Sequence, residues 1–298
     1  MPSAQKSESP SIAFLATTPA NQASHNDNHL RLPQIFSAAG AQVEIHEHKK
    51  VSWRTGTVWL DQRPGESFDL IWPLGFGPRQ LSLDLFDILQ HIPQHKLITK
   101  VSAYRDFHAK LPWISAGPQT IMGTQVEHFA AAFHDKSCSK WVLKPNAGSL
   151  GRDVYQIESI GELEETLQSH PPSYWLLQPY LSGIRDGEFR TLVCADNVLG
   201  TYKRTSNGLT TNLSQGGVAE LADLPTDHQD VVTATSAQLT KLGIGFAAID
   251  TVDGKLMEVN LANPGGLGTL AQLLDSDPYQ RVCDRLVESI SARHHLMF

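Results

Sequence analysis

Two short apolar segments near the carboxyl end of the chain, residues 245–252 and 255–259, are separated only by Asp253 and Gly254. An Asp-Gly pair between two strand-like runs is a strong signal for a tight β-hairpin. This pair therefore predicts two adjacent antiparallel strands in the last third of the chain. This turn restricts the fold more than any other feature of the sequence, because it fixes both the pairing and the register of two strands.

The predicted hairpin has oxygen-bearing side chains on one face. Asp250 lies near the end of the first strand, and Glu258 and Asn260 are two positions apart on the second. Successive side chains on a strand point to opposite faces, so Glu258 and Asn260 point the same way. Carboxylate and amide oxygens suit magnesium bound together with phosphate. The alternative is a solvated hairpin with scattered polar residues, and the apolar neighbours in both strands argue against it.

The first hundred residues alternate between strand and helix patterns. Strands are expected at 11–17, 41–46, 68–73 and 96–98, and helices at 81–91 and around Leu32 to Ala39, with Pro33 in a first turn. This alternation is typical of an open α/β unit with a mainly parallel sheet.

The rest of the chain has a different pattern. The middle third predicts helices at 126–133 and 160–169 and strands at 140–144, 154–157 and 175–178. The last third predicts strands at 188–195, 198–204, 245–252 and 255–259, and helices at about 227–242 and 278–293.

A lysine followed by a glycine-bearing loop forms a second candidate site. The apolar run that ends in Lys144 and Pro145 leads into Gly148 and Gly151. An ammonium and the backbone N–H groups of such a loop can surround phosphate. The lysine precedes the glycines, so this is not a Walker loop. Taken alone, the segment is equally compatible with an ordinary surface turn.

Two further blocks could contribute to nucleotide binding. The connector 176–181, with Gln178, Tyr180 and Leu181, could hydrogen-bond an adenine edge, and Glu188 could bind ribose hydroxyls. A linker without a ligand is the alternative. The remaining polar candidates are Arg190, Lys203, Arg204 and Asn212.

Charge and composition restrict the partners. The net charge is −7, from 24 basic and 31 acidic residues, which argues against nucleic acid or an anionic membrane as partner. The three cysteines form no CxxC pair, so neither a disulfide framework nor a cysteine zinc site is expected. Residues 1–10 are polar and are expected to be a disordered tail. Without a signal-peptide core or a stretch of about 18 apolar residues, a cytoplasmic protein is expected.

In order and spacing, these blocks resemble the ATP-grasp superfamily, specifically its glutathione synthetase-like branch, over roughly residues 105–266. The resemblance implies an α/β fold with an α+β lid. Its parts would be an N-terminal open parallel α/β domain (11–100), a central lid (101–176) and a C-terminal domain with an antiparallel sheet (177–298).

The resemblance also implies roles for the candidate residues. ATP would be bound by Arg105, Lys144, Gly148, Gly151, Gln178, Tyr180, Leu181, Glu188 and Asn212. Magnesium would be held by Asp250, Glu258 and Asn260, and Arg190 and Arg204 would be catalytic, stabilising the transferring phosphoryl group or the substrate carboxylate. Asn263 would lie at the substrate end.

The activity implied is ATP- and Mg²⁺-dependent joining of a small-molecule carboxylate to an amine through an acyl phosphate. Relatives carry a second phosphate-contacting lysine before the lid; Arg105 and Lys110 are the candidates, and the spacing favours Arg105. Residues 207–212 lack the arginine found in glutathione synthetases, which leaves both substrates open. An ATP-binding regulatory module, phosphoryl transfer to a hydroxyl, and a homo-oligomer also remain open.

Overall fold

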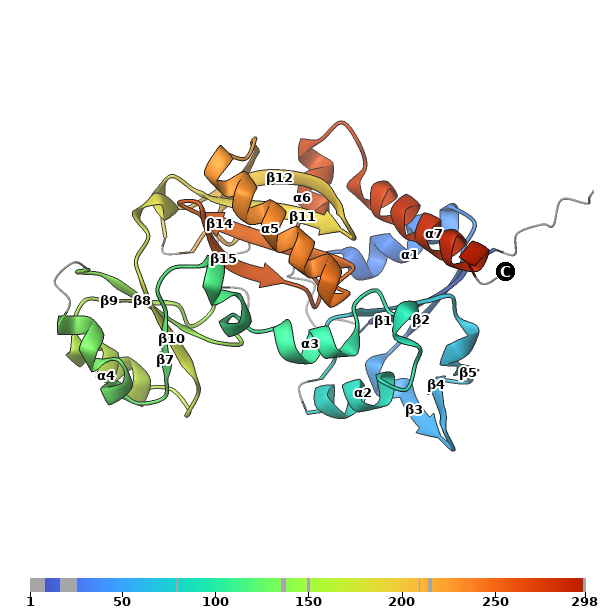
Figure 1. The fold of residues 1–298 in the computed structure, drawn as a ribbon, viewed down its shortest axis with the longest axis horizontal. Coiled ribbons are helices and arrows are strands. Elements are labelled where there is room, and N and C mark those ends of the chain that lie inside the picture. The colour runs from blue at the N-terminus through green and yellow to red at the C-terminus, as the bar shows by residue number, and fades with distance from the viewer. Residues whose placement is uncertain are drawn as a thin grey trace, which may run out of the picture.

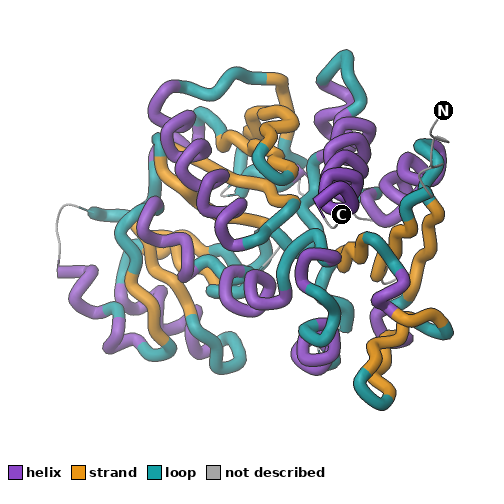
Figure 2. The backbone as a smooth tube through the Cα atoms, turned by 45° about the vertical axis from the view of Figure 1, so that its right-hand side comes forward, coloured by secondary structure: helices purple, strands orange, loops and turns teal. Residues whose placement is uncertain are grey.

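The computed structural model describes residues 9–16, 26–78, 80–134, 138–148, 151–208, 210–213 and 216–296. Residues 1–8 of the expected tail lie outside this range. Four β-sheets organise the described chain. The lid lies at one end of the molecule, the N-terminal unit at the other, and the largest sheet between them (Figures 1 and 2).

The N-terminal unit has a parallel sheet in the order β2-β1-β6. Its strands are β1 (Ser11–Ala16), β2 (Gln42–His46) and β6 (Leu70–Leu74), and its helices are α1 (Asn28–Ala38), α2 (Ser82–Leu89) and α3 (Val101–Phe107). The parallel α/β prediction is thereby confirmed.

Two details of this unit differ from the prediction. The strand expected at 96–98 is reduced to a single bridge between Ile71 and Leu97. Pro33 lies inside α1 rather than in its first turn, because the helix begins earlier, at Asn28.

The sequence analysis missed a small antiparallel sheet in the N-terminal unit. It consists of β3 (Val51–Arg54), β4 (Thr57–Leu60) and β5 (Arg63–Pro64). Thr55 and Gly56 connect the first two strands with φ of 49° and 92°. Two successive left-handed residues form the turn that favours a two-residue hairpin.

The lid has an antiparallel sheet in the order β7-β10-β8-β9, covered by α4. Its elements are β7 (Ile121–Gly123), β10 (Trp175–Pro179), β8 (Trp141–Pro145), β9 (Tyr155–Ile157) and the helix α4 (Ile160–Gln168). The helix expected at 126–133 is instead two short 3₁₀ helices, Val126–His128 and Ala130–His134. The strand of this sheet that comes last along the chain is β10, and it continues to Pro179, beyond residue 176, where the lid was expected to end.

The C-terminal unit has a five-stranded antiparallel sheet in the order β13-β12-β11-β14-β15. The strands are β13 (Val218–Leu221), β12 (Asn197–Thr205), β11 (Glu188–Cys194), β14 (Phe246–Val252) and β15 (Lys255–Asn260). Three helices accompany it: α5 (Thr226–Leu242), α6 (Leu267–Leu273) and α7 (Pro278–Leu296). The predicted hairpin is β14–β15, and Asp253 and Gly254 form its turn with φ of 50° and 65°.

The hydrophobic cores show how the units are held together. Two clusters combine residues of the N-terminal sheet with residues of the C-terminal sheet, as in the packing of Trp72 against Phe246. A third cluster lies entirely within the lid and includes Phe129, Leu143 and Trp175. The N- and C-terminal units therefore share a core, whereas the lid has one of its own.

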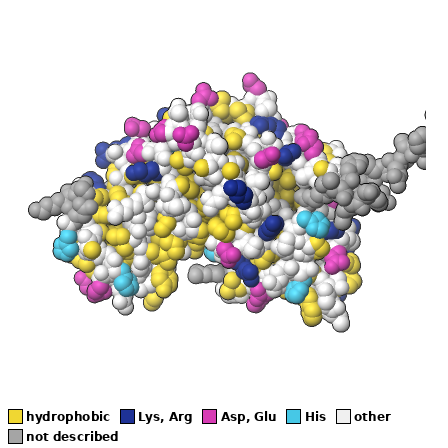
Figure 3. Space-filling model, viewed as in Figure 1, with side chains coloured by type: hydrophobic (Ala, Val, Ile, Leu, Met, Phe, Trp, Pro, Cys, Tyr) yellow, Lys and Arg dark blue, Asp and Glu magenta, His cyan; other side chains and the backbone are white. Residues whose placement is uncertain are grey.

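Figure 3 shows how charged side chains are distributed on one face of the molecule. Basic and acidic side chains are interspersed on the face drawn in Figure 3, rather than gathered into a basic stripe. Among the described residues, none of the helices has both the length and the apolar composition required to span a membrane.

Candidate active site

One large cavity, of about 750 Å³, lies where the three units meet. Every predicted site residue except Arg105 lines it. These residues are Lys144, Gly148, Gly151, Gln178, Tyr180, Leu181, Glu188, Arg190, Arg204, Asn212, Asp250, Glu258 and Asn260. Side chains from four separate blocks of the sequence therefore face one space.

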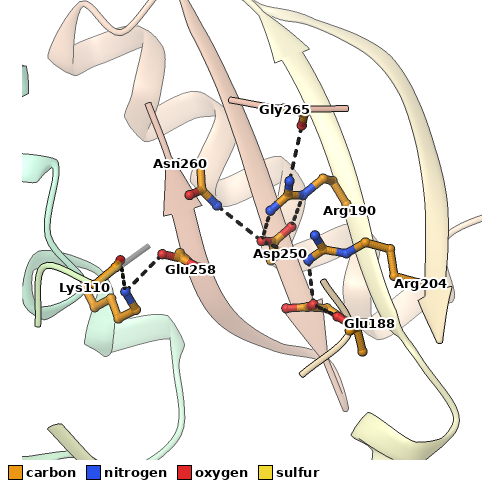
Figure 4. Close-up of polar contacts among 10 residues, drawn as sticks. Lys110, Glu188, Arg190, Arg204, Asp250, Glu258, Asn260 and Gly265 are labelled. Atoms are coloured by element: carbon orange, nitrogen blue, oxygen red, sulfur yellow. Dashed lines mark hydrogen bonds and ion pairs between the residues drawn. The ribbon is translucent and has the colours of Figure 1, made fainter. Parts of the chain in front are cut away.

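The β14–β15 hairpin forms the polar floor of the cavity. Asp250 lies directly opposite Glu258 in the register of the two strands. Asn260 donates from Nδ2 to Oδ2 of Asp250 at 3.3 Å. The predicted set of Asp250, Glu258 and Asn260 is thus on one face, as Figure 4 shows.

Arg190 and Asp250 form an ion pair with two hydrogen bonds in the floor of the cavity. From β11, Arg190 donates from Nε to Oδ1 at 2.8 Å and from Nη2 to Oδ2 at 2.6 Å. Its Nη1 donates to the carbonyl of Gly265 at 3.2 Å. Asp250 is only 1% exposed. Burial opposes ionisation, but Arg190 and Arg204 outweigh it and keep the pKa of Asp250 below its ordinary value.

Arg204, from β12, connects this pair to a second carboxylate. Its Nη2 is 2.5 Å from Oε2 of Glu188 and 3.2 Å from Oδ2 of Asp250. The hydroxyl of Thr211 also donates to Oε2 of Glu188. Sequence reasoning did not single out Thr211, a buried polar residue next to the predicted Asn212. The two arginines and two carboxylates therefore form one continuous network (Figure 4).

Lys110, and not Arg105, supplies the cation that precedes the lid. Lys110 Nζ is 3.0 Å from Oε1 of Glu258 and donates to the carbonyl of Gly148 at 2.9 Å. Arg105 does not line the cavity; its guanidinium lies 3.9 Å from Asp87 at the surface. Arg105 lies within α3, whereas Lys110 follows the helix and lines the cavity, so the structure favours Lys110, and the ATP-binding role expected for Arg105 stays a prediction.

Lys144 contributes a buried ammonium from the lid. It lies on β8 and is 7% exposed. Burial lowers its pKa to about 8, although Glu258 acts in the opposite direction. Among the described residues, no hydrogen bond or ion pair reaches its ammonium. A buried cation without a partner is costly, so this side chain favours an anionic ligand.

The segment after β10 forms the wall next to the lid. Gln178 donates from Nε2 to Thr120 Oγ1 at 2.7 Å and is 5% exposed. Its Oε1 is buried without a hydrogen-bond partner. Buried polar atoms are nearly always paired, so an unpaired acceptor facing a cavity indicates a ligand with a donor.

The opposite end of the cavity is built jointly by the N-terminal unit and the segment 262–266. Asn28 donates from Nδ2 to Oδ1 of Asn263 at 3.0 Å and to the carbonyl of Pro264 at 2.9 Å. The N–H of Gly75 donates to the carbonyl of Ala262 at 2.9 Å. Asn28 was missed because its partner is 235 positions away in the chain.

The charges of the described lining favour a polyanion. Five cationic side chains, Lys110, Lys144, Arg152, Arg190 and Arg204, face three carboxylates, Glu188, Asp250 and Glu258. The cavity is therefore cationic in a chain whose net charge is −7.

Comparison with known proteins identifies similar chains. Residues 107–275 match the family described as prokaryotic glutathione synthetase, ATP-grasp domain. The chain is 26% identical over 279 residues to a glutathione synthetase of Prochlorococcus marinus subsp. pastoris. The matched region covers 87% of this chain and 88% of that protein.

Solved structures share the fold. The crystal structure of the D-cycloserine synthetase DcsG matches with a TM-score of 0.68 at 15% identity, over 94% of this chain and 99% of that one. The ATP-grasp ligase PsnB, complexed with minimal precursor, Mg and ADP, matches with a TM-score of 0.67 at 14% identity, over 94% and 98%. At such identities the likeness shows the mixed α/β ATP-grasp fold alone.

Proposed function

Because the chain belongs to the prokaryotic glutathione synthetase ATP-grasp family, we propose that its cavity binds Mg²⁺-ATP and activates a carboxylate as an acyl phosphate. The protein is an ATP-dependent carboxylate–amine ligase of the glutathione synthetase-like kind. The observation that supports the proposed site most strongly is the convergence of Lys110, Lys144 and Arg190 on one cavity with Asp250 and Glu258.

ATP occupies the space between the lid and the C-terminal sheet. The adenine lies against Gln178, Tyr180 and Leu181, and the unpaired Oε1 of Gln178 accepts a hydrogen bond from its amino group. The ribose lies near Glu188, and Lys144 neutralises phosphate charge. The lid residues of this site belong to a separate hydrophobic core, so the lid can adjust to the nucleotide without disturbing the shared core.

The hairpin suits a hard divalent cation. Asp250 and Glu258 are directly opposed, Asn260 is next to them, and the pKa of Asp250 is held low, so this carboxylate is ionised. Oxygen donors of this kind match Mg²⁺ shared with phosphate. Bound there, Mg²⁺ would neutralise developing charge on the phosphate oxygens.

The reaction then proceeds in two displacements. An oxygen of the substrate carboxylate attacks the γ-phosphorus, the bond to ADP breaks, and Arg190 and Arg204 stabilise charge on the transferring group. The amine nitrogen next attacks the acyl carbon, and inorganic phosphate leaves. Catalysis is by positioning and charge neutralisation, and no side chain becomes covalently bonded.

The substrates are a small-molecule carboxylate and an amine. They enter at the end formed by Asn26, Asn28 and Asn263, away from the adenine wall. The proposal includes a cytoplasmic location, which fits ATP as substrate and three free cysteines. The regulatory alternative is not favoured, since the phosphate lysines, arginines and oxygen ligands are all present.

The test is ADP release with Mg²⁺-ATP across a panel of amino acids, γ-glutamyl peptides and other carboxylates, each with a series of amines. The proposal predicts ADP release that needs both substrates and a product with the mass of their amide. ADP release that is independent of the amine, with phosphate transferred to a hydroxyl, would contradict it.

A further inference from the structure

The ring of His108 lies on the cavity wall in a defined tautomer. His108 follows α3, and its Nδ1 is 2.9 Å from the carbonyl of Tyr104 and 3.2 Å from that of Arg105. A carbonyl oxygen only accepts hydrogen bonds, so Nδ1 is the protonated nitrogen. In the neutral ring, Nε2 therefore has the free lone pair.

The segment around His108 connects to two other parts of the cavity lining. Its ring packs edge-on against Phe76, with the centroids 5.4 Å apart, and Phe76 follows Gly75, which is bonded to Ala262. Two residues further on, Lys110 reaches Glu258. The ring therefore packs on the residue that follows Gly75, and its own segment leads to the lysine at the proposed magnesium site.

The second displacement needs a base at this place. An amine is protonated at neutral pH, and only its neutral form can attack an acyl phosphate. The three carboxylates of the described lining are each ion-paired with lysine or arginine. Among the described lining residues, His108 offers at Nε2 an imidazole nitrogen that no described hydrogen bond or ion pair occupies.

We propose that Nε2 of His108 is the general base that deprotonates the attacking amine, an assignment that rests on the proposed function. The ammonium loses one proton to Nε2, and the nitrogen lone pair forms the C–N bond. The acyl C–O bond breaks, and its electrons leave with phosphate. The departing phosphate accepts the second N–H proton and leaves as hydrogen phosphate, and His108, which is exposed, returns its proton to solvent.

The experiment compares two amines in a His108→Gln variant, using the carboxylate that the panel identifies. One amine is the substrate amine, and the other is hydroxylamine, which is mostly unprotonated at neutral pH and does not need the base. We expect amide formation with the substrate amine to fall by about 10²- to 10⁴-fold, the range of general base catalysis. Hydroxamate formation should stay within a few-fold of wild type. The matched control is His91→Gln, an exposed histidine away from the cavity.

Equal losses with both amines, or no loss with either, would overturn the assignment. Absence of hydroxamate from the wild-type protein with every carboxylate would instead refute the proposed function. A second measurement needs no substrate: ¹⁵N spectra of histidine-labelled protein, with His108 assigned by difference from the variant, should show the Nδ1–H tautomer. The Nε2–H tautomer would contradict the proposal.

Discussion

Arg190 donates hydrogen bonds to both carboxylate oxygens of Asp250, at 2.8 Å and 2.6 Å, in a site where Asp250 is 1% exposed. The pair is therefore a fixed element of the cavity floor rather than a surface contact. It also presents one arginine edge to Gly265. Asp250 is held ionised, and Arg190 is held where the proposed function places the transferring phosphoryl group.

Removing Arg190 should cost both stability and activity. In Arg190→Ala, the buried Asp250 loses its main partner, and breaking such a pair typically lowers the free energy of unfolding by about 3–5 kcal/mol. The double variant Arg190→Ala/Asp250→Asn should recover much of that loss but no activity. Denaturant unfolding and ADP release measure the two effects. Additive destabilisation in the double variant would contradict the pairing.

Glu258→Gln should abolish turnover and leave the fold intact. The change keeps the size of the side chain and removes a ligand charge, as well as the ion pair with Lys110. We expect a loss of at least about 10²-fold in ADP release, typical of removing one electrostatic contact to a transition state. Circular dichroism should be unchanged. Near-normal turnover would show that the hairpin is not the metal site.

Lys110 and Arg105 offer a matched comparison. Lys110→Ala should reduce ADP release by about 10²-fold or more, because its ammonium lies at Glu258 and the Gly148 carbonyl. Arg105→Ala should stay close to wild type, because its 3.9 Å contact with Asp87 is an exposed one. The opposite ranking of the two variants would restore Arg105 to the site.

Lys144 should show a conflict between stability and function. Burial lowers its pKa from 10.5 to about 8, so in the pH window between these values the unfolded chain binds more protons than the folded one. The free energy of unfolding therefore rises with pH through this window. At pH 7 the buried charge costs about 3 kcal/mol. Lys144→Met should raise the Tm of the nucleotide-free protein by removing that cost.

The same shift predicts the pH dependence of ATP binding. In the wild-type protein, affinity for ATP should fall above about pH 8, as the Lys144 ammonium is lost. In Lys144→Met, affinity should be weaker at pH 7 and should lack this decline. Calorimetric titration at several pH values measures both. A parallel decline in the two proteins would mean that another group is responsible.

The structural features predicted most successfully are those that neighbouring residues determine, such as hairpin turns. The β14–β15 hairpin follows from an Asp-Gly turn between two alternating segments, so Asp250 and Glu258 could be placed on one face before the structure was known. The β3–β4 hairpin had a similar signal, a Thr-Gly turn between Val51 and Leu60, and was missed.

Tertiary contacts set the limit of prediction. Spacing alone favoured Arg105, whereas in the folded chain Lys110 is the residue of the two that lines the cavity. Asn28 and Asn263 meet across 235 positions of sequence, so only the folded chain shows that they are hydrogen-bonded to each other. The orientation of the His108 ring likewise depends on its bonds to backbone carbonyls.

The most direct test of the central claim follows an oxygen atom from the carboxylate. The identified carboxylate would be labelled with ¹⁸O in both oxygens, and the phosphate released with ADP would be analysed by mass spectrometry. Activation as an acyl phosphate predicts that one ¹⁸O atom appears in the released phosphate, and the other in the amide. Unlabelled phosphate would contradict carboxylate activation, and with it the proposed mechanism.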